Sequence, residues 1–225
     1  MNVIVAFAEL PFARIANLLA FMFLLMSFLL IIRNSLAAQV RMFAAQSAVL
    51  SALAAVVAYF GGSLELFGVA MVFAIMKVIV IPSVLMRAVT KIGLQRRVAP
   101  YLSTSPTLAI CGGLVVVAFY VMAPVTASSR LPTADGIPLA FAGVLIGLFT
   151  TVNRRRALTQ ILGFLMLENS IFMIALLATY GVPLIVEIGV SLDALVAVLI
   201  LEVFIYRIKE NFESIDVKQM RSLRG

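Results

Sequence analysis

Long apolar runs alternate with short polar links along the whole chain, and each run is long enough to cross a bilayer. A transmembrane helix needs about 20 mainly apolar residues. The pattern therefore predicts an all-α integral membrane protein with seven transmembrane helices, at 15–32, 42–60, 64–86, 107–125, 137–152, 157–180 and 183–206. A membrane β-barrel would show short segments of alternating polarity instead. Residues 1–225 are interpreted as one membrane domain with a charged cytoplasmic tail at 207–225.

Most basic residues lie in alternate links, which predicts the orientation of the helices. The chain has 17 Lys and Arg residues, and 14 of them lie in links on one side of the membrane under this scheme. Of the other three, Arg14 and Arg130 lie on the opposite side and Lys77 lies within the membrane. Those 14 are Arg33, Arg41, Arg87, Lys91, Arg96, Arg97, Arg154, Arg155, Arg156, Arg207, Lys209, Lys218, Arg221 and Arg224. Because Lys and Arg concentrate in cytoplasmic loops, the N-terminus is expected outside and the C-terminus inside.

An offset of about 121 residues favours an internal repeat of three helices. The offset places Arg33 on Arg154 and Tyr59 on Tyr180 and, with a slip of one residue, Gln46 on Glu168. The halves would be 15–87 and 137–207, linked by a helix at 107–125 that reverses direction. This order predicts parallel halves, in contrast to the inverted repeats of several carrier families.

Composition supports the membrane assignment and removes several classes of function. With 64% hydrophobic and 12% charged residues, the chain lies far outside the range of soluble proteins. The net charge of +7 comes from basic residues in the links, where the positive-inside rule explains them. A nucleic-acid partner is therefore not expected, whereas contact with the lipid bilayer is. The single cysteine, Cys111, and the absence of histidine exclude the usual zinc, haem and iron–sulfur ligand sets within the chain. We expect this chain to bind no cofactor.

Glu168 lies near the middle of the apolar run at 157–180. An ionisable group at the bilayer centre costs about 2.5–3.5 kcal/mol on insertion scales and usually faces protein, water or a charge pathway. Burial disfavours the carboxylate unless a cation or water supports it. Glu168 is therefore a candidate proton-relay residue; the alternative is an acid that only holds helices together, with Asn169 as a partner. Ala157, Gly163 and Ser170 in the same run are interpreted as helix-packing positions.

Two acids in the run at 183–206 are further candidates. The short link Gly181-Val182-Pro183 predicts a hairpin that brings Asp193 beside the Glu168 helix at a similar depth. Glu202 lies nine residues further on, about 13 Å along the helix axis and half a turn away. Asp193 either relays protons or has only a structural role. Glu202 is either a second residue of the relay or an acid whose side chain extends to the membrane surface.

Lys77 is the one base within the predicted spans, five residues before Pro82. A proline inside a helix cannot donate to the preceding turn and kinks the helix, which makes room for polar groups or water. Lys77 therefore either pairs with an acid or carries a proton, or it extends its ammonium group to the cytoplasmic edge. No nucleophile and base set, phosphate loop or glycine fingerprint is present, so we expect no catalysis by this chain alone.

With these residues placed, the last third resembles the K subunits of respiratory complex I and the C subunits of Mrp-type antiporters. The match runs from about residue 139 to 225. It comprises the basic link Arg154-Arg155-Arg156, the sequence Leu167-Glu168-Asn169-Ser170 in a second helix, and an acid, Asp193, in a third. The resemblance implies that Glu168 takes the place of the mid-membrane glutamate of those families. Asp193 lies about one turn from the second acid, and neither Lys77 nor Glu202 has an assigned counterpart.

Over its whole length the chain resembles the component E family of hydrogenase-4, membrane subunits of complex I-like, group 4 nickel–iron hydrogenases of the formate hydrogenlyase type. This resemblance implies a location in a bacterial or archaeal cytoplasmic membrane, beside antiporter-like membrane subunits and a cytoplasmic hydrogenase arm. It also implies proton or sodium translocation coupled to electron transfer in other subunits, through a polar path with Glu168, Asp193, Lys77 and Glu202. The alternatives are a subunit of a multi-subunit cation/proton antiporter and a purely structural membrane subunit.

Overall fold

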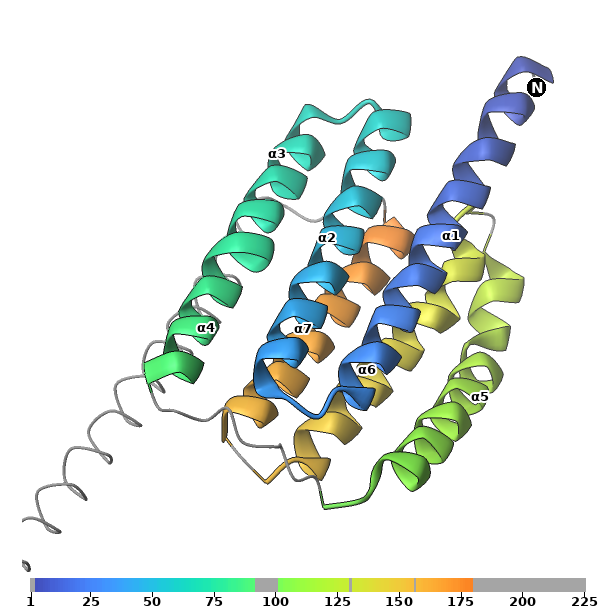
Figure 1. Cartoon of the computed structure of the whole chain (residues 1–225). Coiled ribbons are helices and arrows are strands. Elements are labelled where there is room, and N and C mark those ends of the chain that lie inside the picture. Colours follow the sequence, from blue (N-terminus) through green and yellow to red (C-terminus); the bar gives the residue numbers. More distant parts are fainter. Residues whose placement is uncertain (1–2, 92–100, 130, 156, 180–225) are drawn as a thin grey trace, which may run out of the picture.

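The computed structural model describes residues 3–91, 101–129, 131–155 and 157–179, and every long element in this part of the chain is a helix (Figure 1). The helices are α1 (Val3–Ile32), α2 (Leu36–Gly61), α3 (Leu64–Phe73), the π-helix η1 (Ala74–Val80), α4 (Ile81–Lys91), α5 (Thr104–Ser128), the short 3-10 helix η2 (Ala134–Gly136), α6 (Ile137–Asn153) and α7 (Ala157–Thr179). Helices α3, η1 and α4 continue into one another. In the described residues, six spans are long and apolar enough to cross a membrane, which confirms the all-α membrane assignment. The predicted span at 183–206 and the tail at 207–225 lie outside the described residues.

Two helices begin earlier than predicted: α1 begins at Val3 rather than residue 15, and α2 begins at Leu36 rather than residue 42. Arg41 was assigned to the cytoplasmic link, but Ser35 caps α2 by accepting a hydrogen bond from the Ala38 N–H. A cap of this kind satisfies one of the free N–H groups of the first turn. Arg41 therefore lies inside α2, and the link between α1 and α2 is only three residues long.

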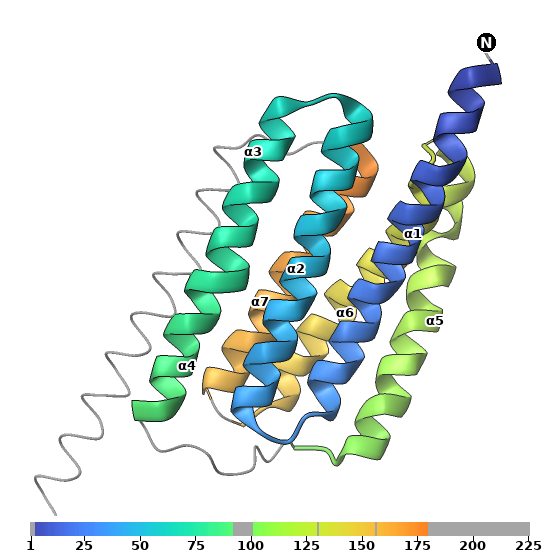
Figure 2. The same ribbon diagram turned by 45° about the horizontal axis from the view of Figure 1, so that its top comes forward.

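Four helices form the centre of the bundle, and the other spans pack on its two sides (Figures 1 and 2). Helices α1 and α2 pack together, α6 and α7 pack together, and the two pairs meet through α1 with α6 and α2 with α7. The α3–η1–α4 span packs against α2, and α5 packs against α6 and α1. Among the six spans in the described residues α5 is the least buried, and most of its surface does not pack against the rest of the bundle.

The third span changes from α-helix to π-helix directly before Pro82. In η1 the hydrogen bonds span five residues, as shown by the Ile81 N–H that donates to the Met76 carbonyl. Pro82 has no N–H, so it cannot restore the α-helical pattern at the next position. The wider turn of a π-helix shifts the helix face on which the side chains lie, and such segments often occur at functional sites. Lys77 lies within η1.

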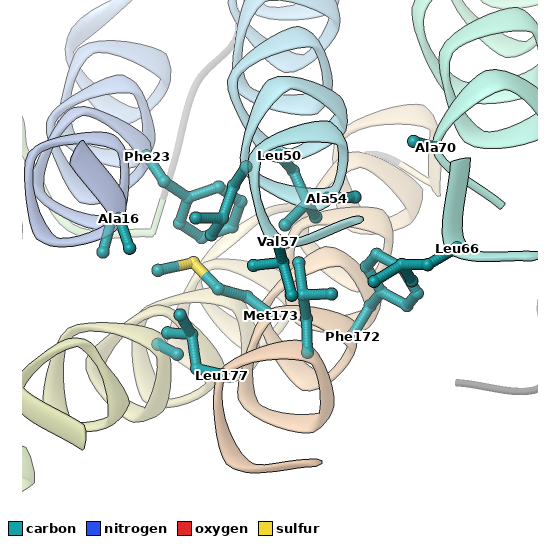
Figure 3. Close-up of a cluster of buried hydrophobic side chains, with 14 of the residues drawn as sticks. Ala16, Phe23, Leu50, Ala54, Val57, Leu66, Ala70, Phe172, Met173 and Leu177 are labelled. Atoms are coloured by element: carbon teal, nitrogen blue, oxygen red, sulfur yellow. The ribbon is translucent and has the colours of Figure 1, made fainter. Parts of the chain in front are cut away.

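The buried apolar side chains form two clusters, one toward each end of the bundle. The first apolar cluster lies toward the α2–α3 turn and includes Phe23, Leu50, Val57, Phe73, Phe172 and Met173 (Figure 3). The second apolar cluster lies toward the α1–α2 and α6–α7 links and includes Phe43, Ile81, Leu85, Ile146, Leu162 and Met166. In α2, the third span and α7, the residues between the two clusters include Gln46, Lys77 and Glu168. Polar residues therefore occupy the middle of the bundle, between two apolar layers.

Reciprocal glycines bring the backbones of α6 and α7 into close contact. A methyl group on Gly147 would lie 2.7 Å from the Leu167 nitrogen, and one on Gly163 would lie 2.6 Å from the Thr151 nitrogen. A methyl group on Gly143 would meet the Ser170 hydroxyl at 2.5 Å. Small residues allow this approach between membrane helices. Gly163 and Ser170 are thus confirmed as packing positions; Ala157 is exposed, so that prediction was wrong.

Candidate functional site

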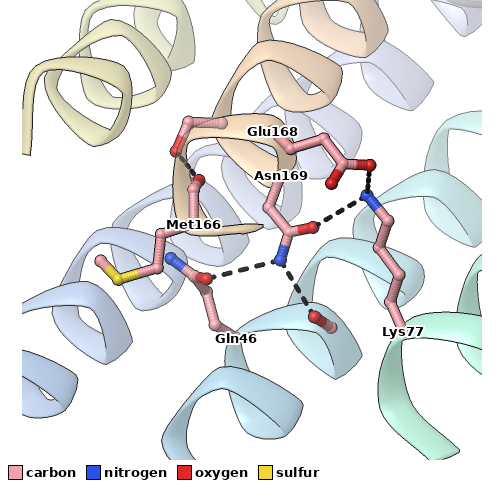
Figure 4. Close-up of polar contacts among 7 residues, drawn as sticks. Gln46, Lys77, Met166, Glu168 and Asn169 are labelled. Carbon is pink, nitrogen blue, oxygen red and sulfur yellow. Dashed lines mark hydrogen bonds and ion pairs between the residues drawn. The ribbon is translucent and has the colours of Figure 1, made fainter. Parts of the chain in front are cut away.

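The centre of the bundle holds a buried ion pair between Lys77 of η1 and Glu168 of α7 (Figure 4). The Lys77 Nζ lies 2.5 Å from Glu168 Oε1, and the two side chains are 1% and 10% exposed. Lys77 lies 13 residues from each end of the span Leu64–Thr90, and Glu168 lies 11 residues from each end of α7. Each charged group therefore lies at the midpoint of its own transmembrane span.

Asn169 provides a second acceptor for Lys77 and connects the pair to α2 (Figure 4). The Lys77 Nζ donates to Asn169 Oδ1 at 3.3 Å. The Asn169 Nδ2 donates to Ser47 Oγ at 2.9 Å and to Gln46 Oε1 at 3.4 Å. All four residues are buried, so these bonds replace hydration that the bilayer interior cannot supply.

The hydrogen bonds continue from α2 to α1. The Gln46 Nε2 donates to Ser27 Oγ at 2.6 Å, and the Ser27 hydroxyl donates to the Phe23 carbonyl at 3.1 Å. Both side chains are fully buried. We call the set Ser27, Gln46, Ser47, Lys77, Glu168 and Asn169 the central polar cluster. It joins α1, α2, η1 and α7 across the middle of the bundle.

An aromatic stack closes the ion pair on the side of the first apolar cluster. The rings of Phe73 and Phe172 stack with centroids 4.8 Å apart. Phe73 precedes Lys77 by four residues and Phe172 follows Glu168 by four, so each ring lies one turn from its charged residue. The Lys77 ammonium also lies 4.7 Å from the Phe73 centroid, where the ring face favours a positive charge.

The structure brings two of the four candidate residues into contact. Lys77 is buried and paired with Glu168, so its side chain does not extend to the membrane surface. Asp193 and Glu202 lie outside the described residues. The second oxygen of Glu168, Oε2, is buried and has no hydrogen-bond partner among the residues that the structure describes. One carboxylate oxygen is thus held by Lys77, and the other is open.

The pair can hold one exchangeable proton in a place that water reaches poorly. In the charged form an ammonium faces a carboxylate; addition of a proton to Glu168 leaves the ammonium beside a neutral acid. Buried acid and base pairs of this kind are typical of proton relays in membrane proteins. Such a pair stabilises helix packing only when the two charged groups are well aligned and their remaining donors and acceptors are hydrogen bonded, because desolvation offsets the ionic attraction.

The contribution of α2 and α1 to this site was not predicted from the sequence. Gln46 was noted only as the counterpart of Glu168 in the repeat, and Ser27 and Ser47 were not singled out. A signal was present, because an amide or hydroxyl near the middle of an apolar run needs a partner there. The signal is weak for serine, whose hydroxyl can bond the carbonyl four residues earlier, as Ser27 does with Phe23.

Arg154 ties the α6–α7 link to α1 at one end of the bundle. Its Nη2 donates to the Ile31 carbonyl at 3.2 Å, and its own carbonyl accepts from Gln160 Nε2 at 2.8 Å. Burial lowers the pKa of the guanidinium, because desolvation disfavours the charged form. The contact places a cation at the C-terminus of α1, where the helix dipole favours it.

We expect Arg154→Met to destabilise the protein by about 2 kcal/mol, the value of a buried hydrogen bond to a charged group. Arg155→Met is the matched control, since it removes one charge from the same link and so has the same effect on topology. Arg155 is exposed and stacks on Tyr101 at 4.6 Å, a contact worth about 0.5–1 kcal/mol. Unfolding in detergent with denaturant measures both; equal losses would contradict the role of Arg154.

Metal binding has no support in the described part of the chain. Within it, no group of three or more His, Cys, Asp or Glu side chains lies close enough to hold a metal ion.

Comparison with known proteins finds similarity to proteins of several bacteria. It is 40% identical to the uncharacterized protein Rv0085 of Mycobacterium tuberculosis over 160 residues, which cover 71% of this chain and 73% of that protein. It is 31% identical to hydrogenase-4 component E of Escherichia coli K12 over 116 residues, 50% of this chain and 52% of component E. Component E of Shigella flexneri gives the same values.

The match to component E spans about half the length of each protein, so it shows a distant similarity. This finding confirms the expected resemblance at that level. No protein-family model and no solved structure matches the chain. The identity and coverage of the mycobacterial relative are high enough to assign the family, and the chain belongs to the family that includes the uncharacterized protein Rv0085 of Mycobacterium tuberculosis.

Proposed function

We propose that the protein is a membrane subunit of a complex I-like, group 4 nickel–iron hydrogenase, and that its central polar cluster contributes to proton or sodium translocation. Electron transfer in other subunits drives this movement. The observation that carries the proposal is the Lys77–Glu168 pair at the midpoint of two spans, between two apolar layers. The similarity to hydrogenase-4 component E supports membership in such a complex.

The desolvation cost of the Lys77–Glu168 pair supports a functional role. Two charges taken out of water lose several kcal/mol of hydration each, and apolar residues of similar size would often be as stable or more so. A bundle that needed only packing has no use for a lysine and an acid at its centre. The open Glu168 Oε2 adds to this argument, because a purely structural acid would be expected to satisfy both oxygens.

The orientation and partners belong to the same proposal. The basic links favour a cytoplasmic side that carries Arg33 and Arg154, with the N-terminus outside. Antiporter-like membrane subunits and a cytoplasmic hydrogenase arm are the expected partners. Asp193 and Glu202 are proposed to extend the polar path from Glu168.

The parallel repeat is also part of the proposal, and two hydrogen bonds support it. Gln39 Nε2 donates to the Arg33 carbonyl at 2.7 Å, and Gln160 Nε2 donates to the Arg154 carbonyl at 2.8 Å. The two pairs are separated by the same 121 residues that the sequence indicated. The repeat-related helices α2 and α7 contact each other, and Gln46 of α2 hydrogen bonds with α7.

Glu168→Gln tests the function. Gln keeps the size and can still accept from Lys77, but it cannot take up a proton, so coupled ion movement should fall to the level of passive leak while the complex remains assembled. Proton and sodium uptake are measured separately in vesicles during hydrogenase turnover. Glu65→Gln is the matched control, because Glu65 is an exposed acid in the first turn of α3.

The alternatives give different results in the same preparation. Unchanged coupling in an assembled Glu168→Gln complex would leave Glu168 with a structural role. Purification in mild detergent, with nickel and iron measured on the sample, separates the hydrogenase from an antiporter. Nickel with a large cytoplasmic arm supports the hydrogenase; antiporter-like subunits without metal support the other assembly.

A further inference from the structure

The direction of the hydrogen bonds at Lys77 is fixed by the chemistry of its ammonium group. Lysine has three donors and no acceptor, so Asn169 must face it with Oδ1 and not with its amide nitrogen. The Asn169 Nδ2 then faces α2 and donates to Ser47 and Gln46. A reversed amide would bring two donors together, 3.3 Å apart.

The same direction continues to the end of the cluster. Gln46 accepts from Asn169 through Oε1 and donates to Ser27 through Nε2. The Ser27 hydroxyl donates to the Phe23 carbonyl, which has no hydrogen to donate to a further group. The bonds from Asn169 onward therefore point away from Lys77; one branch ends at Ser47 of α2, and the branch through Gln46 and Ser27 ends on the backbone of α1. The cluster holds Asn169 Oδ1 toward the ammonium group and is poorly suited to carry a proton itself.

The two carboxylate oxygens of Glu168 differ in their hydrogen bonding. Lys77 occupies Oε1, whereas Oε2 is buried and has no hydrogen-bond partner among the described residues. A proton that reaches Glu168 therefore finds free lone pairs on Oε2. The charged group that faces Glu168 in the described part of the chain is Lys77; α2 contributes the uncharged Gln46 and Ser47 to the cluster.

Lys77 donates to Glu168 Oε1 and to Asn169 Oδ1 at the same time. We propose that Asn169 is the positioning residue that keeps holding the ammonium group when Glu168 takes up a proton. In this step a hydronium ion gives one proton to Oε2 and becomes water, and the carboxylate becomes a neutral acid. Lys77 keeps its three ammonium protons, loses the ionic attraction of Glu168 and retains its hydrogen bond to Asn169 Oδ1. The charge of the pair rises from zero to one, and no other covalent bond forms or breaks. Loss of the proton reverses the step.

This inference rests on the proposed function and names its ion, which is the proton. A sodium ion at Glu168 would lie beside the Lys77 ammonium, and like charges disfavour that arrangement. Hard cations also need several oxygen ligands, as Ca²⁺ and Mg²⁺ do. The open Oε2 offers one, and Asn169 Oδ1 is already occupied by Lys77.

Infrared spectroscopy of the full-length protein in lipid nanodiscs tests the step. The carbonyl stretch of a protonated carboxyl group, assigned to Glu168 by its loss in Glu168→Gln, should appear as the pH is lowered. Asn169→Leu removes the second acceptor at similar volume and should move this transition to lower pH by about one unit, a tenfold change in proton affinity. Asn169→Ala serves the same purpose if Asn169→Leu does not fold, with a smaller shift in the same direction.

Ser27→Ala is the matched control, because it cuts the far end of the cluster and leaves Asn169 beside Lys77. Its transition should stay within a few tenths of a pH unit of the wild type, well below the shift expected for Asn169. An unchanged or raised transition in the Asn169 variants would overturn the role of Asn169. A wild-type transition that moves with sodium concentration would overturn the choice of the proton. Both readings are independent of coupled transport, so they fail separately from the proposed function.

Discussion

Lys77→Met should destabilise the folded protein by about 3–5 kcal/mol, as expected when one partner of a buried ion pair is removed. The substitution leaves Glu168 at the centre of the bundle without its cation, and Asn169 loses the donor that faces its Oδ1. Neither group can turn to water, because both are buried. Unfolding of the purified protein in detergent micelles measures the loss.

The double variant Lys77→Met, Glu168→Leu is the control for this prediction. It removes both charges and keeps similar volumes, so its stability should return to within about 1–2 kcal/mol of the wild type. Coupled ion movement should remain absent in the double variant, since the proton site is gone. If the double variant were as unstable as Lys77→Met, the loss could not be attributed to an unpaired buried charge.

Gly147→Leu should prevent the α6–α7 hairpin from closing and should lower stability by about 3 kcal/mol or more, at the upper end for overpacked cores. A methyl group alone would lie 2.7 Å from the Leu167 nitrogen, and backbone cannot move aside as a flexible side chain can. Leu167 directly precedes Glu168, so any shift of α7 at this point also displaces the ion pair. The yield and melting temperature of the purified protein measure the effect.

Gly112→Leu provides the matched control for this substitution. Gly112 lies within α5, and nothing lies within 4 Å of the position that its Cβ would take. The same change should therefore be tolerated there, with stability equal to or slightly above that of the wild type because leucine favours helix. Equal losses at the two glycines would mean that the added bulk, and not the helix contact, is responsible.

The position of the site between two apolar layers connects stability with function. The first and second apolar clusters restrict water at the centre of the bundle, which strengthens the attraction between Lys77 and Glu168. The same exclusion raises the cost of any unpaired charge there. A proton that enters or leaves therefore needs the compensating acceptor that Asn169 supplies.

The sequence predicted the spans and the central position of Glu168 well, because both depend on local chemistry. Apolar runs of bilayer length predict helices whatever their neighbours are. The six spans in the described residues follow from this rule, as does the position of Glu168 in the middle of its span. The boundary of α2 was wrong because a helix can continue past the bilayer core when Ser35 caps it.

Neighbouring helices could not be predicted in the same way. Membrane helices are apolar on every side, so the sequence carries little information about which face meets which partner. Lys77 was consistent with pairing or with extension to the membrane edge, and the sequence favoured neither. The acid with which it pairs, Glu168, is 91 residues away in the chain.

By itself, the sequence determined that this chain is a multi-span helical membrane protein with an acid near the middle of one apolar run and a base within another. The reason is that burial of twenty apolar residues and the cost of a buried charge are properties of each segment alone. Only the tertiary structure decided that Lys77 and Glu168 belong to one site, and that Asn169 with Gln46 and Ser47 orients the lysine. Those contacts depend on the close packing of α6 on α7, which glycines permit, and on the packing of α2 against both η1 and α7. Hydrogen bonds between residues far apart in the sequence then select one arrangement of the helices.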